Sequence, residues 1–173
     1  GGGGLAFLGR APDLGRGMNP KVTGGAGKRV WLAGASGGVG AALARELAGR
    51  GARVALSARS VDKLRALAIE NALLLPCDAT DTASLATARA SLLAAWRGID
   101  LVIYLAGDYV PMRAADFDLV VAERVVTVNF NGAMRLTAAV LPDLRAGGGL
   151  VSAPFTHPPA PDTVLELVWL LLL

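Results

Sequence analysis

A glycine-rich stretch at residues 33–40 is the part of the sequence best suited to chemistry. It reads Ala-Gly-Ala-Ser-Gly-Gly-Val-Gly and lies between the apolar run 30–33 and a segment of helical length. Glycines at a strand-to-helix turn let the backbone approach a ligand closely, and the helix N-terminus that follows offers free N–H groups and a partial positive charge. Both features suit a pyrophosphate. The stretch therefore predicts phosphate binding, with a merely tight turn as the alternative.

A basic residue, Arg59, follows the second apolar run at residues 54–56, after Ser57 and Ala58. A site for NAD needs a carboxylate at this place, to accept hydrogen bonds from the ribose 2′-hydroxyl. A guanidinium can instead hold a 2′-phosphate with two hydrogen bonds. Arg59 therefore favours NADP over NAD. The alternative is a solvated surface arginine ahead of a helix.

An acidic residue, Asp78, follows the third apolar run at residues 73–75. Its carboxylate can bind a ligand at the end of a strand, or it can cap the next helix, a role that Asp81 could fill alone. Cys77, beside it, has no neighbouring His in the sequence to activate a thiol. We therefore expect Cys77 to be a small core residue and not a nucleophile.

The elements that must position these residues alternate along the chain. Short apolar runs lie at residues 30–33, 54–56, 73–75, 101–104 and 150–151, with segments of helical length between them. Fully apolar strands separated by helices predict a parallel sheet covered on both faces, and right-handed crossovers make it doubly wound. The predicted fold class is therefore α/β with three αβα layers. Ligands of such sheets bind beyond the carboxyl ends of the strands.

Apolar spacing and capping residues predict the helices in more detail. The inner faces of the first three are expected to carry Val39, Leu43 and Leu47; Val61, Leu64 and Ala68; and Leu85, Ala88, Leu92 and Trp96. Ser60 is the expected N-cap of the second helix, and Asp81 or Thr82 that of the third. A long fourth helix is expected over residues 117–144, ended by the glycines at 147–149 before a fifth strand begins at Leu150.

The glycine turn resembles that of the short-chain dehydrogenase/reductase family. Gly34, Gly38 and Gly40 fit the family pattern Thr-Gly-x-x-x-Gly-x-Gly, with Ala33 where Thr is usual. Gly34, Gly37 and Gly40 also fit the Gly-x-x-Gly-x-x-Gly spacing of the family's longer, sugar-epimerase branch. The turn is therefore similar to both branches and does not separate them.

Further positions extend the resemblance over about residues 28–151. Leu105, Ala106 and Gly107 are similar to the family's Asn-Ala-Gly motif, with Leu in place of Asn, and residues 128–132 resemble its Asn-x-x-Gly motif through Asn129. The family Asn distorts its helix and holds a water for a proton relay. Propensity alone disfavours amides inside a helix, so Asn129 calls for a reason. The alternative interpretation is that Asn129 is an amide that faces solvent.

The resemblance implies a Rossmann-type fold and an NADP-dependent oxidoreductase that acts on a small-molecule carbonyl or alcohol. Asp78 would bind the adenine amino group. The expected cofactor-binding residues are Gly34, Ser36, Gly37, Gly38, Val39, Gly40, Arg59, Asp78, Ala79, Ala106 and Gly107, and the expected catalytic positions are Asn129 and Ser152. A homo-oligomer formed through the long helix around Asn129 is a further expectation.

The family's chemistry uses a Tyr-x-x-x-Lys pair that this sequence does not contain. The Tyr is the acid or base at the substrate carbonyl, and the Lys lowers the pKa of that Tyr and holds the ribose. Tyr104 is expected in a core strand and Tyr109 in the loop after it, so neither is a suitable substitute. A non-catalytic dinucleotide-binding module or an inactive fragment is therefore the alternative to an enzyme.

Composition narrows the remaining classes. The chain has 173 residues, is 53% hydrophobic, has a formal net charge of +3 and contains one Cys and one His. The single Cys excludes a disulfide framework within the chain, and the single His argues against a His-based metal site. The charge is too small to indicate nucleic-acid binding, and no apolar run reaches the ~20 residues that a membrane-spanning helix needs. A cytoplasmic location is expected.

The sequence predicts three parts. They are a flexible leader over 1–27, a dinucleotide-binding domain over 28–152 and a divergent tail rich in Pro and Leu over 153–173. Met18 is the expected natural start, with residues 1–17 as an extension. The change after Ser152 suggests a truncated or frameshifted reading, so we expect the Rossmann-type sheet to be incomplete at its C-terminal side.

Overall fold

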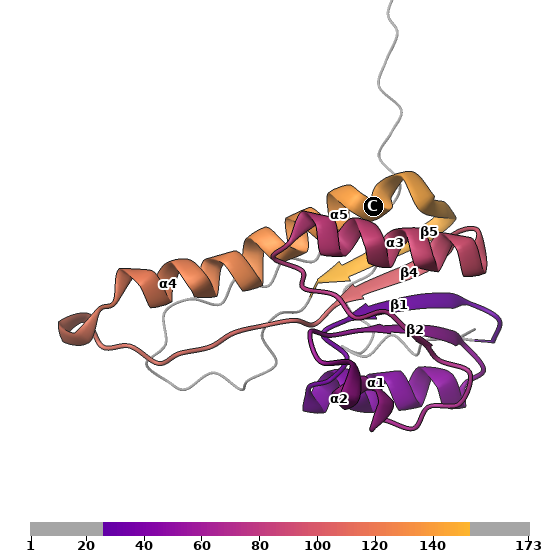
Figure 1. Cartoon of the computed structure of the whole chain (residues 1–173), viewed down its shortest axis with the longest axis horizontal. Coiled ribbons are helices and arrows are strands. Elements are labelled where there is room, and N and C mark those ends of the chain that lie inside the picture. The colour runs from indigo at the N-terminus through magenta and orange to yellow at the C-terminus, as the bar shows by residue number, and fades with distance from the viewer. Residues whose placement is uncertain (1–25, 153–173) are drawn as a thin grey trace, which may run out of the picture.

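Five strands pair into one parallel sheet, as the alternation of apolar runs and helical segments predicts (Figure 1). The computed structural model describes residues 26–152; the tail expected over 153–173 and the leader expected over 1–27, except its last two residues, lie outside that range. The strands are β1 (Arg29–Ala33), β2 (Arg53–Ser57), β3 (Leu73–Leu74), β4 (Ile99–Tyr104) and β5 (Leu144–Ser152), in the order β3-β2-β1-β4-β5. The order reverses between β1 and β4, where a ligand crevice is expected.

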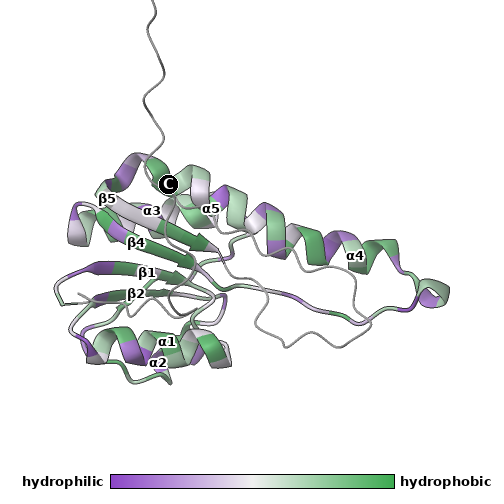
Figure 2. Ribbon diagram, turned by 180° about the vertical axis from the view of Figure 1, so that it is seen from behind, coloured by the Kyte–Doolittle hydropathy of each residue, from purple (hydrophilic) through white to green (hydrophobic). Residues whose placement is uncertain are grey.

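Helices cover both faces of the sheet, and Figure 2 shows the same layers from behind. Helices α1 (Gly38–Gly49) and α2 (Val61–Arg65) lie on one face, and α3 (Thr82–Trp96) and α5 (Gly132–Val140) lie on the other. Alternate strand residues serve the two faces: Val30 and Leu32 join the core under α1, whereas Trp31 and Ala33 join the core under α3 and α5. The predicted three-layer, doubly wound fold is confirmed.

The predicted inner face of α3 is confirmed, whereas that of α1 is partly wrong. Asp81 caps α3, and Leu85, Ala88, Leu92 and Trp96 are buried. The buried residues of α1 are Gly40, Ala41, Ala44 and Leu47, while Val39 is 47% exposed. A Cβ at Gly40 would lie 2.3 Å from the carbonyl oxygen of Gly34. The helix therefore approaches the strand through its small residues, which turns Val39 outward.

Helix α2 is shorter than predicted. Ser60 caps it, as expected, by accepting a hydrogen bond from the Lys63 N–H at 3.4 Å, and Leu64 is buried. Ala68, however, lies beyond the end of the helix, is exposed and has a φ of 51°. The expectation that Ala68 faces inward is therefore wrong, because the chain has already left the helix.

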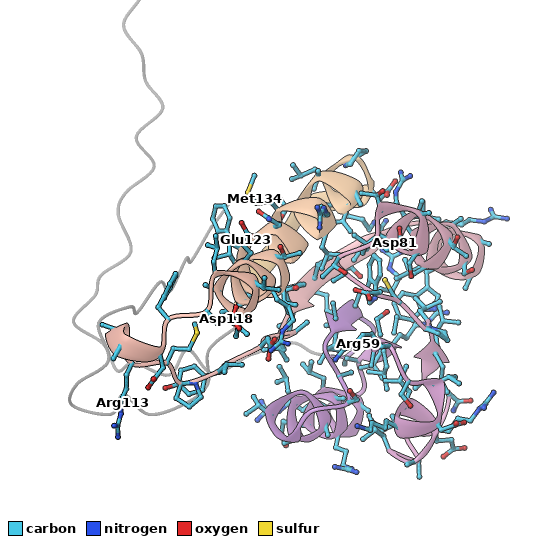
Figure 3. All side chains as sticks on the ribbon, turned by 60° about the vertical axis from the view of Figure 1, so that its left-hand side comes forward. Arg59, Asp81, Arg113, Asp118, Glu123 and Met134 are labelled. Carbon is cyan, nitrogen blue, oxygen red and sulfur yellow. The ribbon has the colours of Figure 1, made fainter. Side chains whose placement is uncertain are left out.

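The region expected to form one helix over 117–144 is built from several pieces. They are the 3₁₀ turn η1 (Ala114–Asp116), α4 (Leu119–Val126), the π-helical turn η2 (Thr127–Asn131), α5 and the 3₁₀ turn η3 (Leu141–Asp143). Asp118 caps α4 by accepting from the N–H groups of Val120 and Val121, and Figure 3 labels it together with Glu123 and Met134 farther along. A π-helical turn is frequent at functional sites.

The boundary between the last helix and β5 differs from the prediction. Pro142 has no N–H and its ring conflicts with the preceding helical turn, so α5 ends at Val140 and β5 begins at Leu144. The glycines at 147–149 lie inside β5 and do not end a helix. They accommodate a register shift, because Ile99 pairs with Leu144 whereas Leu101 pairs with Gly149.

A partly buried ion pair at the amino end of the sheet makes the stability of the chain depend on pH in the acid range. Arg29 donates from Nε and Nη2 to the two carboxylate oxygens of Asp100, each at 3.0 Å, and the side chains are only 12% and 15% exposed. These hydrogen bonds lower the pKa of Asp100 from 3.8 to about 2. Because the folded-state pKa is the lower one, the stabilisation is present above pH 5 and is lost as the pH falls towards 2.

We therefore expect Asp100→Asn to flatten the acid dependence of unfolding. The pKa difference corresponds to about 2 kcal/mol of stability at neutral pH that wild type loses in acid. Urea unfolding at pH 7 and at pH 3 measures about half of this loss, roughly 1 kcal/mol, because pH 3 is still above the folded-state pKa of about 2. Asp62→Asn is the control, because Asp62 pairs with Arg65 at the surface with side chains 86% and 66% exposed. An equal acid loss in wild type and Asp100→Asn would contradict the prediction.

Candidate functional site

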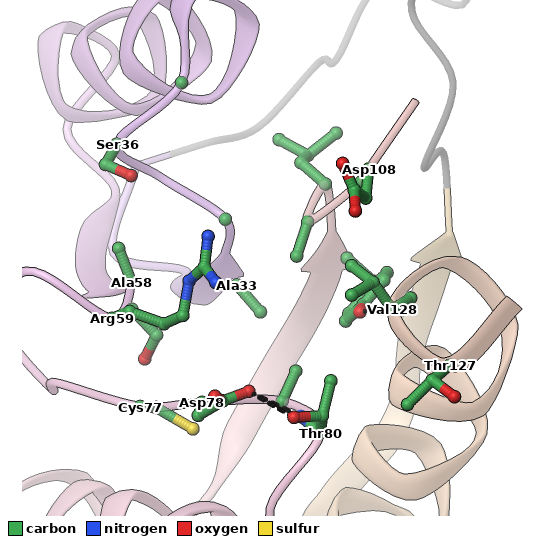
Figure 4. A pocket seen from close by; sticks show the side chains of 18 of the residues that line it. Ala33, Ser36, Ala58, Arg59, Cys77, Asp78, Thr80, Asp108, Thr127 and Val128 are labelled. Carbon is green, nitrogen blue, oxygen red and sulfur yellow. Dashed lines mark hydrogen bonds between the residues drawn. The ribbon is translucent and has the colours of Figure 1, made fainter. Parts of the chain in front are cut away.

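A pocket of about 590 Å³ lies at the carboxyl ends of β1, β2 and β4 (Figure 4). Its volume is within the range of small-molecule sites, and its position is where the strand order reverses. The predicted cofactor residues that line it are Gly34, Ser36, Gly37, Arg59, Asp78, Ala79, Ala106 and Gly107. The other predicted residues, Gly38, Val39, Gly40, Asn129 and Ser152, do not line it. The structure thus brings together residues that follow four different strands.

Two glycines of the turn are required by the protein itself. Gly34 has a φ of 93°, and a Cβ there would lie 2.3 Å from the Ala106 backbone nitrogen. A Cβ at Gly40 would meet the Gly34 carbonyl oxygen at the same distance. These two positions let β1, β4 and α1 converge.

The other two glycines of the turn have open space where a side chain would lie. A Cβ at Gly38 would meet nothing within 4 Å, and one at Gly37 only the Gly34 carbonyl oxygen at 4.0 Å. No side chain caps α1, and its first turn contains no acidic residue. The helix N-terminus therefore keeps backbone N–H groups for an anion, which fits the pyrophosphate of a dinucleotide.

Arg59 and Asp78 lie near one another in the pocket (Figure 4). Asp78 Oδ1 accepts hydrogen bonds from the Thr80 hydroxyl at 2.7 Å and the Thr80 N–H at 2.8 Å. These bonds, with a smaller contribution from the charge of Arg59, lower the pKa of Asp78. Asp81 alone caps α3. The helix-capping alternative for Asp78 is therefore wrong, and its ionised carboxylate belongs to the pocket wall.

Asn129 fastens the segment after β4 to the helix layer. The Asp108 N–H donates to Asn129 Oδ1 at 2.7 Å, and Asn129 Nδ2 donates to the Asp108 carbonyl oxygen at 2.8 Å. Asn129 is 7% exposed and lies in the π-helical turn η2. The predicted helix distortion is present, and the solvent-facing alternative is wrong for Asn129. Its side chain does not line the pocket and can affect the pocket only through the Asp108 backbone to which it is hydrogen-bonded.

Tyr104 has a bracing role that sequence reasoning missed. Its hydroxyl donates to the Val128 carbonyl oxygen at 2.5 Å, and a Cβ at Gly132 would lie 2.3 Å from that hydroxyl. Burial is the main cause that raises the pKa of Tyr104 to about 12. The predicted core position is confirmed at 1% exposure, and such a phenol is a poor general acid. The sequence feature that could have indicated this role is the presence of Tyr104 in a core strand together with Gly132, the glycine of the Asn-x-x-Gly motif.

Ser152 ends β5 and is 9% exposed, beside Tyr104 in the strand register. Cys77 belongs to the core under α3, as predicted, and also touches the pocket. Burial raises the pKa of the Cys77 thiol, which makes it a weak nucleophile. Within residues 26–152, no group of three or more His, Cys, Asp or Glu is placed to hold a metal ion. Nor does the described part of the chain contain a helix long and apolar enough to cross a membrane.

Comparisons with known proteins agree with this geometry. The family model for short chain dehydrogenase matches residues 28–152. The human protein "Dehydrogenase/reductase SDR family member 7" is 34% identical over 135 residues, which cover 71% of this chain and 40% of that protein. An uncharacterised short-chain type dehydrogenase/reductase from Sinorhizobium fredii is 30% identical over 78% of this chain and 53% of its own length.

Solved structures share the same fold. A dehydrogenase/reductase from Sinorhizobium meliloti has a TM-score of 0.69 and 27% identity, covering 73% of this chain and 53% of that one. An actinorhodin polyketide ketoreductase variant, solved with NADPH, has a TM-score of 0.63 and 26% identity, covering 66% of this chain and 46% of that one. The chain spans about half the length of the relatives that it matches. It belongs to the short-chain dehydrogenase/reductase family of oxidoreductases, with the Rossmann-type fold of that family.

Proposed function

We propose that residues 28–152 form a dinucleotide-binding domain that takes NADP, as part of an oxidoreductase acting on a carbonyl or alcohol. The observation that carries the proposal is that the glycines of the turn differ in their surroundings. Backbone atoms of the protein occupy the space where a Cβ of Gly34 or Gly40 would lie. The corresponding space at Gly37 and Gly38, at the start of α1, is open. If the turn were only tight, glycine would be required at Gly34 and Gly40 but not at Gly37 and Gly38.

The lining residues suggest how the cofactor would be held. The N–H groups at the start of α1 would bind the pyrophosphate, Arg59 the 2′-phosphate, and Asp78 with Ala79 the adenine end. Ala106 and Gly107 are small enough for the backbone to pass close to a ribose. NADP is proposed over NAD because the pocket offers the Arg59 guanidinium at the end of β2. When bound, the nicotinamide supplies the hydride chemistry of the family.

Asn129 and Ser152 are the two positions proposed for catalysis. Asn129 would act by holding the Asp108 backbone. Ser152 lies opposite Tyr104 at the end of β5 and does not line the pocket, so its proposed catalytic role rests on the family resemblance. The sequence has no Tyr-x-x-x-Lys pair, and the buried Tyr104 is unsuited to that role. A non-catalytic dinucleotide-binding module is therefore the second candidate. NADPH binding without NADPH oxidation across a panel of carbonyl substrates would favour it.

Two further expectations stay predictions. Self-association through the long helical region is supported by apolar side chains on α4 that are exposed, Leu119 at 60% and Val120 at 76%. A cytoplasmic location is the second of these predictions.

The Arg59→Asp variant tests the cofactor assignment. We expect it to weaken NADPH binding roughly tenfold or more, because a charge-assisted contact to the 2′-phosphate is lost and repulsion is added. NADH binding should change little, since NADH has no 2′-phosphate. Titration of both nucleotides by calorimetry measures the preference.

Arg65→Asp is the matched control, because Arg65 is an exposed arginine on the neighbouring α2 and does not line the pocket. An unchanged NADPH-to-NADH preference in Arg59→Asp would remove Arg59 from the site. Absence of NADPH binding by the wild-type chain would contradict the proposed function as a whole.

A further inference from the structure

An ion pair at the wall of the pocket has no role in the cofactor assignment above. Arg124 Nε donates to Asp108 Oδ2 at 2.8 Å, and both residues line the pocket. Asp108 lies in the segment after β4, whereas Arg124 lies on α4, 16 residues farther along the chain. The Asp108 side chain is 32% exposed and that of Arg124 is 56% exposed. The pair therefore joins a strand-end segment to a separate helix.

The partner of Arg124 is already fixed in place from another side. Asn129 pairs with both the N–H and the carbonyl oxygen of Asp108. An exposed ion pair usually contributes little, partly because two long side chains must be ordered to form it. Here the backbone of one partner is held beforehand, so less ordering is needed. The pair adds a third contact to the same residue and completes a clamp on the wall formed by Ala106, Gly107 and Asp108.

The same ion pair also connects helix α4 to the rest of the fold. None of the α4 residues in the described part of the chain is buried, and Figure 1 shows α4 extending beyond the end of the sheet. Val121, Ala122 and Val125 are partly buried and the other α4 residues are exposed, so core packing holds this helix only weakly. The continuous turn η2 and the contact between Arg124 and Asp108 therefore contribute to its attachment to the rest of the molecule.

We propose that Arg124 is a positioning residue, which acts through Asp108 to hold the wall of the pocket in the arrangement that binds the nucleotide. The proposal rests on the proposed function for its ligand, and on the structure alone for the clamp. The positioning effect comes from an ion pair that is partly exposed, so it should weaken in concentrated salt.

Two measurements on the full chain test this assignment. The variants are Arg124→Gln, Asp108→Asn and the double variant, with Arg65→Gln as a control that breaks an exposed ion pair outside the pocket. NADPH titration is expected to show three- to tenfold weaker binding for each single variant, no further loss in the double variant and no change in the control. In 0.5 M salt, wild type should approach the single variants.

Amide hydrogen exchange without nucleotide is the second measurement. Residues 105–109 should exchange faster in Arg124→Gln than in wild type or Arg65→Gln. Unchanged exchange in this segment would overturn the proposal, even if NADPH binding changed, because Arg124 would then act by direct contact. Faster exchange with unchanged NADPH affinity would also overturn it. If wild type bound no NADPH, the proposed function would fail while exchange still decided whether the clamp exists.

Discussion

Replacing Gly34 with alanine is expected to lower the free energy of unfolding by about 3–5 kcal/mol, which is a large share of the total stability of a typical domain. The added Cβ would lie 2.3 Å from the Ala106 nitrogen and 2.6 Å from the Leu105 carbonyl carbon. Both atoms are backbone at the end of β4, a strand paired on both sides. They cannot yield as a flexible side chain would. The φ of 93° adds strain for any residue with a side chain.

Gly38→Ala is the matched control for this prediction. A Cβ at Gly38 meets nothing within 4 Å, and the residue lies in the first turn of α1, where alanine is the better helix former. We expect its unfolding free energy to equal or slightly exceed that of wild type in urea titrations followed by circular dichroism. Equal stability of Gly34→Ala and Gly38→Ala would show that β1 and β4 do not approach each other at Gly34 as described.

The contrast between these glycines shows what the sequence could and could not predict. The pattern of residues 33–40 located the turn, because glycine spacing between an apolar run and a helix is a local signal. It could not separate Gly34, which the neighbouring strand requires, from Gly38, which it does not. That distinction depends on β4, about seventy residues later. Val39 was assigned to the wrong face of α1 for a similar reason, since close packing at Gly40 sets the rotation of the helix.

Local signals also explain the parts of the fold that were predicted well. The α3 face and its Asp81 cap are encoded within sixteen consecutive residues, and each strand contains a short apolar run. The residues at the strand ends meet in one pocket because parallel strands finish at one edge of the sheet. Arg124 was missed because no spacing rule relates a residue on α4 to one in a loop after β4. Only the folded chain brings its guanidinium to Asp108.

Gly132→Ala is expected to destabilise the chain by about 2–3 kcal/mol through a clash with a single hydroxyl group. The new methyl would lie 2.3 Å from Tyr104 Oη and 3.2 Å from Tyr104 Cζ, with Ala79 Cβ at 3.5 Å. Tyr104 is 1% exposed and its hydroxyl is hydrogen-bonded to the Val128 carbonyl oxygen, so moving the ring away from the new methyl would break that bond and disturb the core. The helix propensity gained by alanine offsets only about 1 kcal/mol of this.

Tyr104→Phe separates the two contacts of the hydroxyl. Alone, it leaves the Val128 carbonyl oxygen without its 2.5 Å donor, which is expected to cost about 1–2 kcal/mol. Combined with Gly132→Ala, it removes the atom that the methyl meets. The double variant should therefore be more stable than the sum of the single effects implies, with a coupling of about 1–2 kcal/mol. Urea unfolding of the four proteins measures this coupling.

Gly49→Ala is the control for helix propensity, since a Cβ there meets nothing within 4 Å at the end of α1. Its effect should be the same in the wild-type and Tyr104→Phe backgrounds. Additive effects of Gly132→Ala and Tyr104→Phe would mean that the hydroxyl does not set the distance between β4 and η2. If the coupling is found, one hydroxyl fixes that distance, and NADPH affinity should follow it, because Tyr104 and Val128 both line the pocket.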